Sequence, residues 1–347
     1  MRQIMLGALA FSAVTLFIKT PAAASAKCPT KSKIPSEDRR IRWAKMSNRL
    51  YVEQGCWTIP EIVAERTDKT GFNKGPIYHF HKTKKRVTNE YTGVYYVEAN
   101  LIITGGATLS IDGSGDEDIA CRTLLVASNS SMYLNIRAHG DNLDIRNTRI
   151  FSWDLVNKAY DTNVEDGRSY ISAITEHITG REKDTCPDYD PTASSSGRAK
   201  KDMGHANMDI FKSEIAYLGY DAPESYGVSY KARGLCKDHS NLDIFDDDND
   251  LKYGVTGNII MSDLHHNWFG HYSWGHDGGV WKKNRVHDNF GYGFDPHDDS
   301  DHLKIIGNER LFLGLFRVVT NAGRVSIRFT TTAGTASSRP SGATTSR

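Results

Sequence analysis

A weak repeat of short segments, each carrying an asparagine, restricts most strongly how this chain can fold. The segments read GNIIMSDLHHN, KNRVHDN and GNERL, and their asparagines, Asn258, Asn284 and Asn308, fall 26 and 24 residues apart. Repetition at this period predicts a solenoid, because each unit buries its apolar face only by stacking on the next one. Asparagines at equivalent corners would then form hydrogen bonds along the stack and satisfy backbone groups there.

Short apolar alternations indicate that β-strands are the stacked units. The clearest are VYYVEANLIITGG from Val94, LDIRNTRIFSW from Leu143 and MDIFKSEIAYLGY from Met208. No stretch between residues 100 and 310 has the periodicity of an amphipathic helix of four turns. The irregular spacing of the segments and the lack of hairpin signals favour a parallel β-helix over a β-sandwich or a β-propeller.

Length and charge restrict the class of protein. The chain has 347 residues and is 39% hydrophobic, which is enough for a sizeable core. Arg2, the apolar run 4–18 and the small residues around Ala24 are typical of a secretory signal over residues 1–26. Cleavage after Ala26 would leave 41 basic and 42 acidic residues, a balance that argues against a nucleic-acid-binding protein. We therefore expect a secreted protein of the extracellular space or cell wall, with no membrane segment after cleavage.

Cysteine usage fits a secreted protein. Five cysteines follow the predicted cleavage site, and their wide spacing does not match a zinc site. In an oxidising compartment they predict two disulfides and one remaining cysteine, without a defined pairing. The five are Cys28, Cys56, Cys121, Cys186 and Cys236.

The segment GYGFDPHDDSD, residues 291–301, gathers a phenol, an imidazole and four aspartates. Tyr292 and His297 can give a proton to a substrate and take one from it. Asp295 can orient the imidazole or hold a substrate hydroxyl, and Pro296 stiffens the turn between them. On the open face of a solenoid, such a pair predicts chemistry on a carbon-bound proton of a chain molecule. The proton next to the carboxylate of a polyuronate is one that enzymes can remove.

An echo of this segment lies one period earlier. GHYSWGHD, residues 270–277, matches GYGFDPHD, residues 291–298, at an offset of 21 residues. Neighbouring coils of a β-helix lie about 4.8 Å apart. The echo therefore predicts that His276 and Asp277 lie beside His297 and Asp298.

The motif YGFDPHD at Tyr292–Asp298 resembles the signature of mannuronan C5-epimerases, which convert mannuronate to guluronate within alginate. The surrounding stretch from about residue 207 to residue 308 resembles the secreted eukaryotic branch of that family, as in brown algae. A weaker resemblance extends back to about Cys28. The resemblance implies a right-handed parallel β-helix, action on a polymer and no redox cofactor.

The resemblance also assigns residues to roles. Tyr292, Asp295 and His297 match the catalytic positions of the family, and Asp298 matches the acidic last place of the motif. Removal of the proton requires the uronate charge to be neutralised, by a cation or by a protonated carboxyl. The predicted substrate-binding residues are Asp298, His276, His266, Arg233 and Lys231, and Arg233 ranks first among the cations. Lys282, Lys283 and Arg285 are further cations near the motif.

Metal sites are weaker interpretations of the same residues. The histidines between residues 265 and 276 lack a zinc pattern, and a role in lining the substrate surface is favoured. The aspartates of segment 291–301 lack the spacing and central glycine of an EF-hand, so no cofactor is required and Ca2+ is left open. Trp268, Trp274 and Trp281 are either core residues or platforms for sugar rings, and alternation along strands predicts some of each.

The sequence changes character after Asn308. It no longer follows the coil rhythm, and from about Thr330 it is rich in Ser, Thr, Gly and Ala, which is typical of disorder. Family members continue with further coils that carry a cationic segment and a cysteine, and no counterpart follows here. The predicted organisation is a signal peptide over 1–26, a β-helix over 27–308 and a divergent, disordered tail over 309–347.

The sequence therefore predicts a secreted enzyme that binds alginate and epimerises mannuronate at C5. An alginate lyase is a close alternative, because removal of the same proton followed by loss of the 4-linked oxygen cleaves the chain. A third reading is an inactive alginate-binding wall protein. The order in which His297 and Tyr292 exchange the proton stays open.

Overall fold

A computed structural model describes most of the chain between Arg39 and Leu311. The described residues are 28, 39–67, 74–79, 93–116, 120–176, 205–233, 255–276, 278–297, 300, 302–311 and 326–328. The predicted signal peptide, Asp298 and most of the predicted tail lie outside them.

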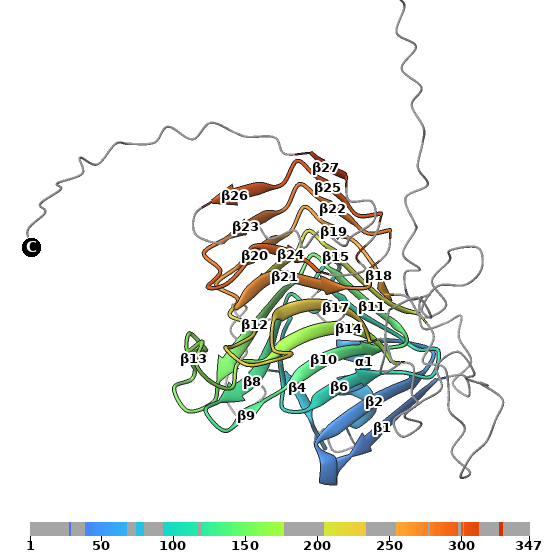
Figure 1. Ribbon diagram of the computed structural model, residues 1–347. Coiled ribbons are helices and arrows are strands. Elements are labelled where there is room, and N and C mark those ends of the chain that lie inside the picture. Colours follow the sequence, from blue (N-terminus) through green and yellow to red (C-terminus); the bar gives the residue numbers. More distant parts are fainter. Residues whose placement is uncertain are drawn as a thin grey trace, which may run out of the picture.

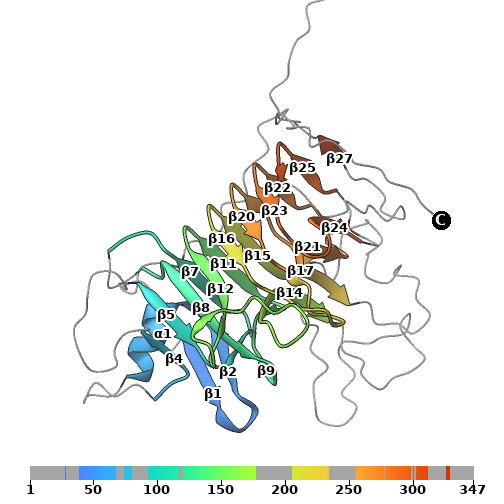
Figure 2. The same ribbon diagram turned by 90° about the vertical axis from the view of Figure 1, so that its left-hand side faces the viewer.

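The chain is wound into a parallel β-helix whose three sheets run the length of the molecule (Figures 1 and 2). Within the described residues, sheet A stacks β1 (Arg40–Ala44), β2 (Arg49–Gln54), β6 (Asn100–Ile103), β10 (Asn135–His139), β14 (Tyr170–Glu176), β17 (Gly227–Arg233), β21 (Phe269–Trp274) and β24 (Phe294–Pro296). Sheet B stacks β3 (Cys56–Thr58), β7 (Thr108–Asp112), β11 (Asn142–Arg146), β15 (Ala206–Phe211), β19 (Ile259–Ile260), β22 (Val280–Lys282), β25 (Lys304–Ile306) and β27 (Ser326–Arg328), with β18 (Val255–Thr256) beside β15.

Sheet C completes each coil. It stacks β4 (Ile77–His79), β5 (Val94–Val97), β8 (Thr123–Asn129), β12 (Arg149–Asp154), β16 (Glu214–Ala216), β20 (Asp263–His265), β23 (Arg285–His287) and β26 (Glu309–Leu311), with β9 (Met132–Tyr133) beside β8 and β13 (Ala159–Tyr160) beside β12. One coil visits sheets A, B and C in that order. The predicted parallel β-helix is confirmed.

Strand register shows how far each coil advances the chain. Ile259 pairs with Trp281, Tyr272 with Asp295, and Trp281 with Ile305. These pairs are separated by 22, 23 and 24 residues, so coil length varies at the corners. The offset of 21 residues that the sequence echo indicated is therefore wrong as a strand register.

The core is a set of aliphatic columns inside the three sheets. In sheet A, Leu50, Leu101, Ile136 and Ile171 lie in register on successive coils, and each is buried. Each strand gives alternate residues to the interior, and only stacking removes those side chains from water. Near the last coils the filling becomes aromatic, because Tyr230, His271 and Trp281 are completely buried.

Ladders of side-chain hydrogen bonds satisfy backbone N–H groups at the corners between sheets. At the corner from sheet B to sheet C, Asn308 Oδ1 accepts the Asn284 N–H at 2.9 Å, and Asn284 Oδ1 accepts the Ser262 N–H at 3.0 Å. Ser262 and Ser213 extend this ladder to Thr148. Asn258 is not part of it. It lies within sheet B, between β18 and β19, where its Oδ1 accepts the Val280 N–H at 3.1 Å. The predicted stacking is thus correct for Asn284 and Asn308 only.

A second asparagine ladder lies at the corner from sheet C to sheet A. Asn267 is completely buried, accepts the Leu218 N–H at 2.9 Å and donates to the Ile215 carbonyl at 3.0 Å. We expect Asn267→Ala to lower the free energy of unfolding by about 2–4 kcal/mol, because two buried backbone groups lose their partners. Denaturant unfolding would measure it. Asn157→Ala, on an exposed turn, should cost less than about 1 kcal/mol, and a similar small loss at Asn267 would contradict the role of the ladder.

The N-terminal end of the solenoid carries a helix. Helix α1 (Ile59–Arg66) begins at a capping box, in which the Thr58 side chain and Glu61 satisfy each other's backbone N–H groups. Its apolar residues Ile59, Ile62 and Val63 are buried and belong to the main core. The helix, together with the antiparallel pair β1 and β2, closes the first coils, as solenoids require. A short 3-10 helix, η3 (Lys45–Ser47), joins β1 to β2.

Strand pairing continues beyond Asn308, where the sequence predicted that the coils would end. Strand β26 pairs with β23, and β27 pairs with β25, with Ile327 in register with Ile305. The prediction failed here because a strand of three residues leaves little periodicity in the sequence. The other residues of the predicted tail lie outside the described part.

One disulfide joins Cys28 to Cys56, while Cys121 is buried with a free thiol. The other two cysteines lie outside the described residues, so the predicted second disulfide stays a prediction. Among the helices that the structure describes, none has the length and apolar character needed to cross a bilayer.

Candidate functional site

The outer side of sheet A at strands β21 and β24 gathers the residues of the motif. Tyr272 lies in register with Asp295, and the His297 N–H donates to the Ser273 carbonyl at 2.8 Å. Alternation along the strands places Ser273 and Pro296 on the other side. Trp274 and His297 therefore follow Tyr272 and Asp295 on the same outer surface.

His297 lies between two aromatic rings of the preceding coil. Its ring stacks on Trp274 with centroids 5.7 Å apart and lies 5.9 Å from the ring of Tyr272. The imidazole is partly exposed. An imidazole held at the surface beside a phenol and an indole can reach a sugar ring that lies on these aromatic faces.

Tyr272 belongs to a stacked pair that covers a cation. Its ring is parallel to Tyr226 at 4.0 Å, and the Lys231 Nζ lies 4.9 Å from the Tyr226 ring and 5.4 Å from the Tyr272 ring. Lys231 also forms an ion pair with Glu224. Lys231 is 3% exposed. This corrects the expectation of a surface cation that binds a carboxylate directly, because its methylene chain and ammonium group lie beneath the tyrosines and Glu224.

Burial and nearby negative charge keep the phenols of this surface protonated. Burial raises the pKa of Tyr272 far above its ordinary value, and the charges of Asp295 and Glu224 add to the effect. Burial likewise raises the pKa of Tyr226, with a further contribution from Glu224. Tyr272 is therefore a neutral hydrogen-bond donor at any physiological pH.

Tyr292 lies at the opposite end of β24 from His297. Its ring packs edge-on against Phe269 with centroids 5.1 Å apart, and Phe269 in turn contacts Tyr226 at 5.2 Å. Tyr292 thus joins the same aromatic surface as His297. The two are five positions apart, which is roughly 16 Å of extended chain, and Tyr272 lies beside the middle of that span.

His276 is not part of this surface. It is completely buried, its Nε2 lies 3.1 Å from the Gly257 carbonyl, and its ring stacks on Tyr230 at 4.3 Å. The structure does not bring it beside His297 as the echo predicted, because the strand register places Trp274 there. Burial lowers the pKa of His276 to about 3.

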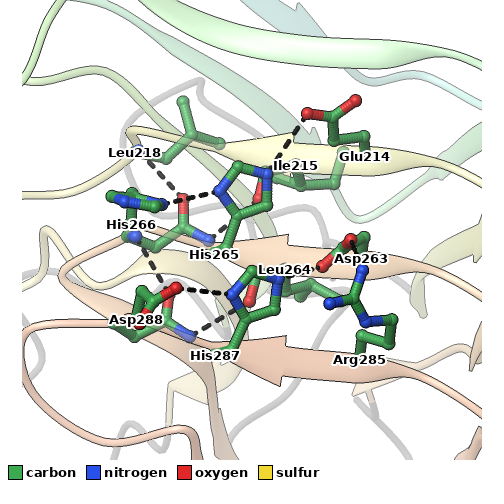
Figure 3. Close-up of polar contacts among 12 residues, drawn as sticks. Glu214, Ile215, Leu218, Asp263, Leu264, His265, His266, Arg285, His287 and Asp288 are labelled. Carbon is green, nitrogen blue, oxygen red and sulfur yellow. Dashed lines mark hydrogen bonds and ion pairs between the residues drawn. The ribbon is translucent and has the colours of Figure 1, made fainter. Parts of the chain in front are cut away.

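His266 lies at the corner that precedes β21, so β21 separates it from the His297 end of the surface. It belongs to a histidine–carboxylate cluster on the outer side of sheet C (Figure 3). Its Nδ1 lies 2.8 Å from the His265 Nδ1, and its ring packs on Tyr217. Burial and the neighbouring His265 lower the pKa of His266. The structure does not bring it to the motif as a substrate ligand.

The remaining predicted residues have different outcomes. Arg233 is the last residue of β17, and its backbone pairs with Glu176, but its side chain is outside the described part, as is Asp298. Trp281 is a core residue at 0% exposure, whereas Trp268, which stacks on Phe269, and Trp274, which stacks on His297, are partly exposed. A role of the latter two as platforms for sugar rings stays a prediction. Lys282, Lys283 and Arg285 belong to sheets B and C and their shared corner.

Asp295 is buried directly below this surface, at 3% exposure. It lies in register with Tyr272, and its charge acts on both Tyr272 and Tyr226. This position suits a carboxylate that orients its neighbours. In the part of the chain that the structure describes, no group of His, Cys, Asp or Glu side chains is arranged to hold a metal ion.

Sequence reasoning did not single out Tyr272, Tyr226 or Glu224. The signal for Tyr272 was its alternation with Trp274 around Ser273 in GHYSW, which places both on one side of a strand. Tyr226 and Glu224 lie in a segment with no strand pattern, and only the fold brings them over Lys231.

Comparison with known proteins finds partial sequence similarity to one group of enzymes. No family model matches the chain. The mannuronan C5-epimerase of Pseudomonas putida is 30% identical over 148 residues, which are 42% of this chain and 26% of that protein. The AlgG mannuronan C5-epimerase of Azotobacter vinelandii is 30% identical over 145 residues, again 42% and 26%.

The matched stretch is similar to mannuronan C5-epimerases. The enzyme of that name from Pseudomonas syringae pv. tomato is 36% identical over 107 residues, 30% of this chain and 18% of its own length. The chain spans about a quarter of the length of the first two relatives. The crystal structure of the periplasmic alginate epimerase AlgG aligns with 74% of this chain and 46% of that one, at 17% identity and a TM-score of 0.48.

Proposed function

We propose that this chain is a mannuronan C5-epimerase that acts on alginate outside the cytoplasm. The observation that carries the proposal is the placement of His297 on the outer side of sheet A, between Trp274 and Tyr272. The similarity to bacterial mannuronan C5-epimerases supports the same reaction class. The relatives compared are bacterial, so membership of the brown-algal branch, secretion and a wall location stay predictions.

The reaction needs a base, an acid on the other face and stabilisation of an enediolate. In the proposed mechanism one group removes the C5 proton, and the electron pair of the C–H bond moves into the uronate carboxylate. A proton delivered to C5 from the opposite face inverts the centre and restores the carboxylate. No redox change occurs, so none of these steps requires a redox cofactor. His297 is one of the two proton carriers.

Electrostatic support comes from beneath the aromatic surface. Lys231 lies under Tyr226 and Tyr272 and is paired with Glu224, where low exposure weakens solvent screening. By offsetting the charge of Glu224 it would reduce the repulsion that the second negative charge on the uronate group meets at this surface. Asp295, in register with Tyr272, would hold the phenol and the substrate hydroxyls in orientation.

Two phenols compete for the second proton position. Tyr292 matches the family motif, whereas Tyr272 is the phenol in contact with His297. The second proton carrier must reach the same C5 atom as His297, and Tyr292 lies roughly 16 Å along the chain from it. We therefore expect Tyr272→Phe to lower kcat by about 100-fold, as loss of an acid–base group does. Tyr292→Phe should instead raise KM, because it removes one hydroxyl from the binding surface and leaves the packing on Phe269 intact. Steady-state rates on polymannuronate would separate the two, and the reverse pattern would assign the acid–base role to Tyr292.

The proposal is tested by proton NMR of polymannuronate incubated with the protein in deuterated water. Epimerisation predicts guluronate signals with deuterium at C5. An alginate lyase would instead give unsaturated chain ends that absorb in the ultraviolet. Binding to alginate without turnover, unchanged by His297→Ala, would identify an inactive binding protein.

A further inference from the structure

A recess of about 550 Å³ lies on the outer surface at the corner from sheet B to sheet C, away from the aromatic surface of sheet A. Its walls carry many ionic side chains from five successive coils. Those used below are Arg149, Lys212, Glu214, Asp263, Lys283 and Arg285. Cations outnumber carboxylates here, although the chain as a whole has a net charge of only +1.

The corner residues form a row along the solenoid axis. Phe211 is in register with Ile260, and Ile260 with Lys282, so the next residues, Lys212, Met261 and Lys283, occupy equivalent corners. All three have left-handed backbone conformations, with φ of 47°, 53° and 56°. The two lysines are exposed. The same corner one coil earlier is Asn147, with φ of 50°.

The carboxylates of the recess already have partners in sheet C (Figure 3). Glu214 accepts from the His265 Nε2 at 3.2 Å. Asp263 lies 2.8 Å from the His287 Nε2 and 3.1 Å from the Arg285 Nη1. The negative charges of Glu214 and Asp263 are therefore mainly compensated by His265, His287 and Arg285.

Three cations of the recess form no close ion pair within the described residues. They are Arg149, Lys212 and Lys283, and all three are exposed. The charge of Arg149 also acts on Glu214, whose hydrogen bond is to His265. Coils repeat at about 4.8 Å, so Lys212 and Lys283, two coils apart, are separated by roughly 10 Å along the axis. Arg149 belongs to the coil before Lys212. A compact anion cannot contact both ends of this row, whereas an extended polyanion that runs parallel to the axis can contact all three.

We propose that this recess is a second, non-catalytic binding site for a polyuronate chain. The inference rests on the proposed function for the identity of the polyanion, and it extends that function to a separate face. A long alginate chain held here raises the effective concentration of its other segments near sheet A. A short oligosaccharide gains nothing from the recess, because it cannot occupy both faces at once.

The test compares a recess variant with a charge-matched control. The recess variant carries Arg149→Gln, Lys212→Asn and Lys283→Asn. Asparagine accepts the left-handed conformation and already occupies the equivalent corner at Asn147, so the fold should persist. The control carries Arg49→Gln, Lys45→Asn and Lys158→Asn at exposed positions outside the recess; Lys158 has a φ of 52°. Circular dichroism would verify that both variants are folded.

Binding of long polymannuronate and of a short mannuronate oligosaccharide is measured by calorimetry at two salt concentrations. We expect the recess variant to lose at least about tenfold in affinity for the long polymer, to show a weaker salt dependence, and to keep its affinity for the oligosaccharide. An equal loss in the control variant, or no loss in the recess variant, overturns the proposal. So does recess-dependent binding of a single-stranded oligonucleotide without binding of polyuronate.

The outcome is separable from that of the proposed function. Loss of polymer affinity in the recess variant supports the second site even if the NMR assay detects no guluronate. Conversely, the protein could epimerise short oligosaccharides fully while its binding of the polymer does not depend on the recess. That result supports the proposed enzymatic function and contradicts the proposal of a second binding site.

Discussion

Replacing His297 with glutamine is expected to lower kcat for guluronate formation by about 10³-fold, within the range that a general acid–base group contributes. Glutamine keeps the volume and can pack against Trp274 and Tyr272, so substrate affinity should change little. The result would show as loss of deuterium incorporation at C5 in the NMR assay, because a glutamine amide neither removes nor returns the proton.

The control for this variant is His205→Gln, since His205 is an exposed histidine outside the aromatic surface. It should retain wild-type turnover. Retention of more than a tenth of the activity by His297→Gln, with thermal unfolding unchanged, would remove His297 from the proton-transfer step. A parallel loss of folding in His297→Gln would be detected by circular dichroism and would call for His297→Asn as a second variant.

The second large effect concerns acid stability and arises from the buried histidines below the site. His276 has a pKa of about 3 in the folded protein against an ordinary 6.5, because burial disfavours the charged ring. Burial also places the pKa of His271 well below 6.5. Below pH 6.5 these two histidines therefore bind protons in the unfolded chain but stay neutral in the folded chain. Each group removes about 1.4 kcal/mol of stability per pH unit as the pH falls from 6.5.

Comparison with a variant isolates this effect. His276→Gln should destabilise the protein at pH 7.5 through lost packing on Tyr230, but the difference from wild type should shrink by about 2 kcal/mol between pH 6.5 and pH 5. Asp141, whose pKa burial raises to about 6, acts in the opposite direction between pH 4 and pH 6, and its contribution cancels in the comparison. Urea unfolding at several pH values measures the difference, and a gap that stays constant with pH would show that His276 is not neutral in the folded state.

The repeat and the motif could be predicted because they depend on local patterns. Apolar alternation indicated strands, and the spacing of Asn284 and Asn308 indicated stacked corners, since a hydrogen-bonding side chain must recur wherever backbone groups turn. The YGFDPHD motif placed Tyr292, Asp295 and His297 on one strand and its flanks. Alternation then put Asp295 and His297 on one side of it.

Partnership between coils could not be predicted in the same way. The echo between residues 270–277 and 291–298 suggested that His276 lies beside His297, yet hydrogen-bond register places Trp274 there. The echo aligns residues of the same type, whereas strands pair through backbone hydrogen bonds. Because the corners between strands differ in length, residues that match in the echo are not the residues that pair. Tyr226 and Glu224 could not be predicted for the same reason, because their contact with Lys231 depends on how the chain folds between them.

The sequence by itself determined that this chain is a stack of short parallel strands and that one strand carries an imidazole, a phenol and a carboxylate. Only the tertiary structure decided which side chains meet that imidazole, which histidines are buried and neutral, and where cations remain unpaired on the surface. The division has a physical cause: strand periodicity is a property of neighbouring residues, while contact between coils depends on the length of every corner that separates them.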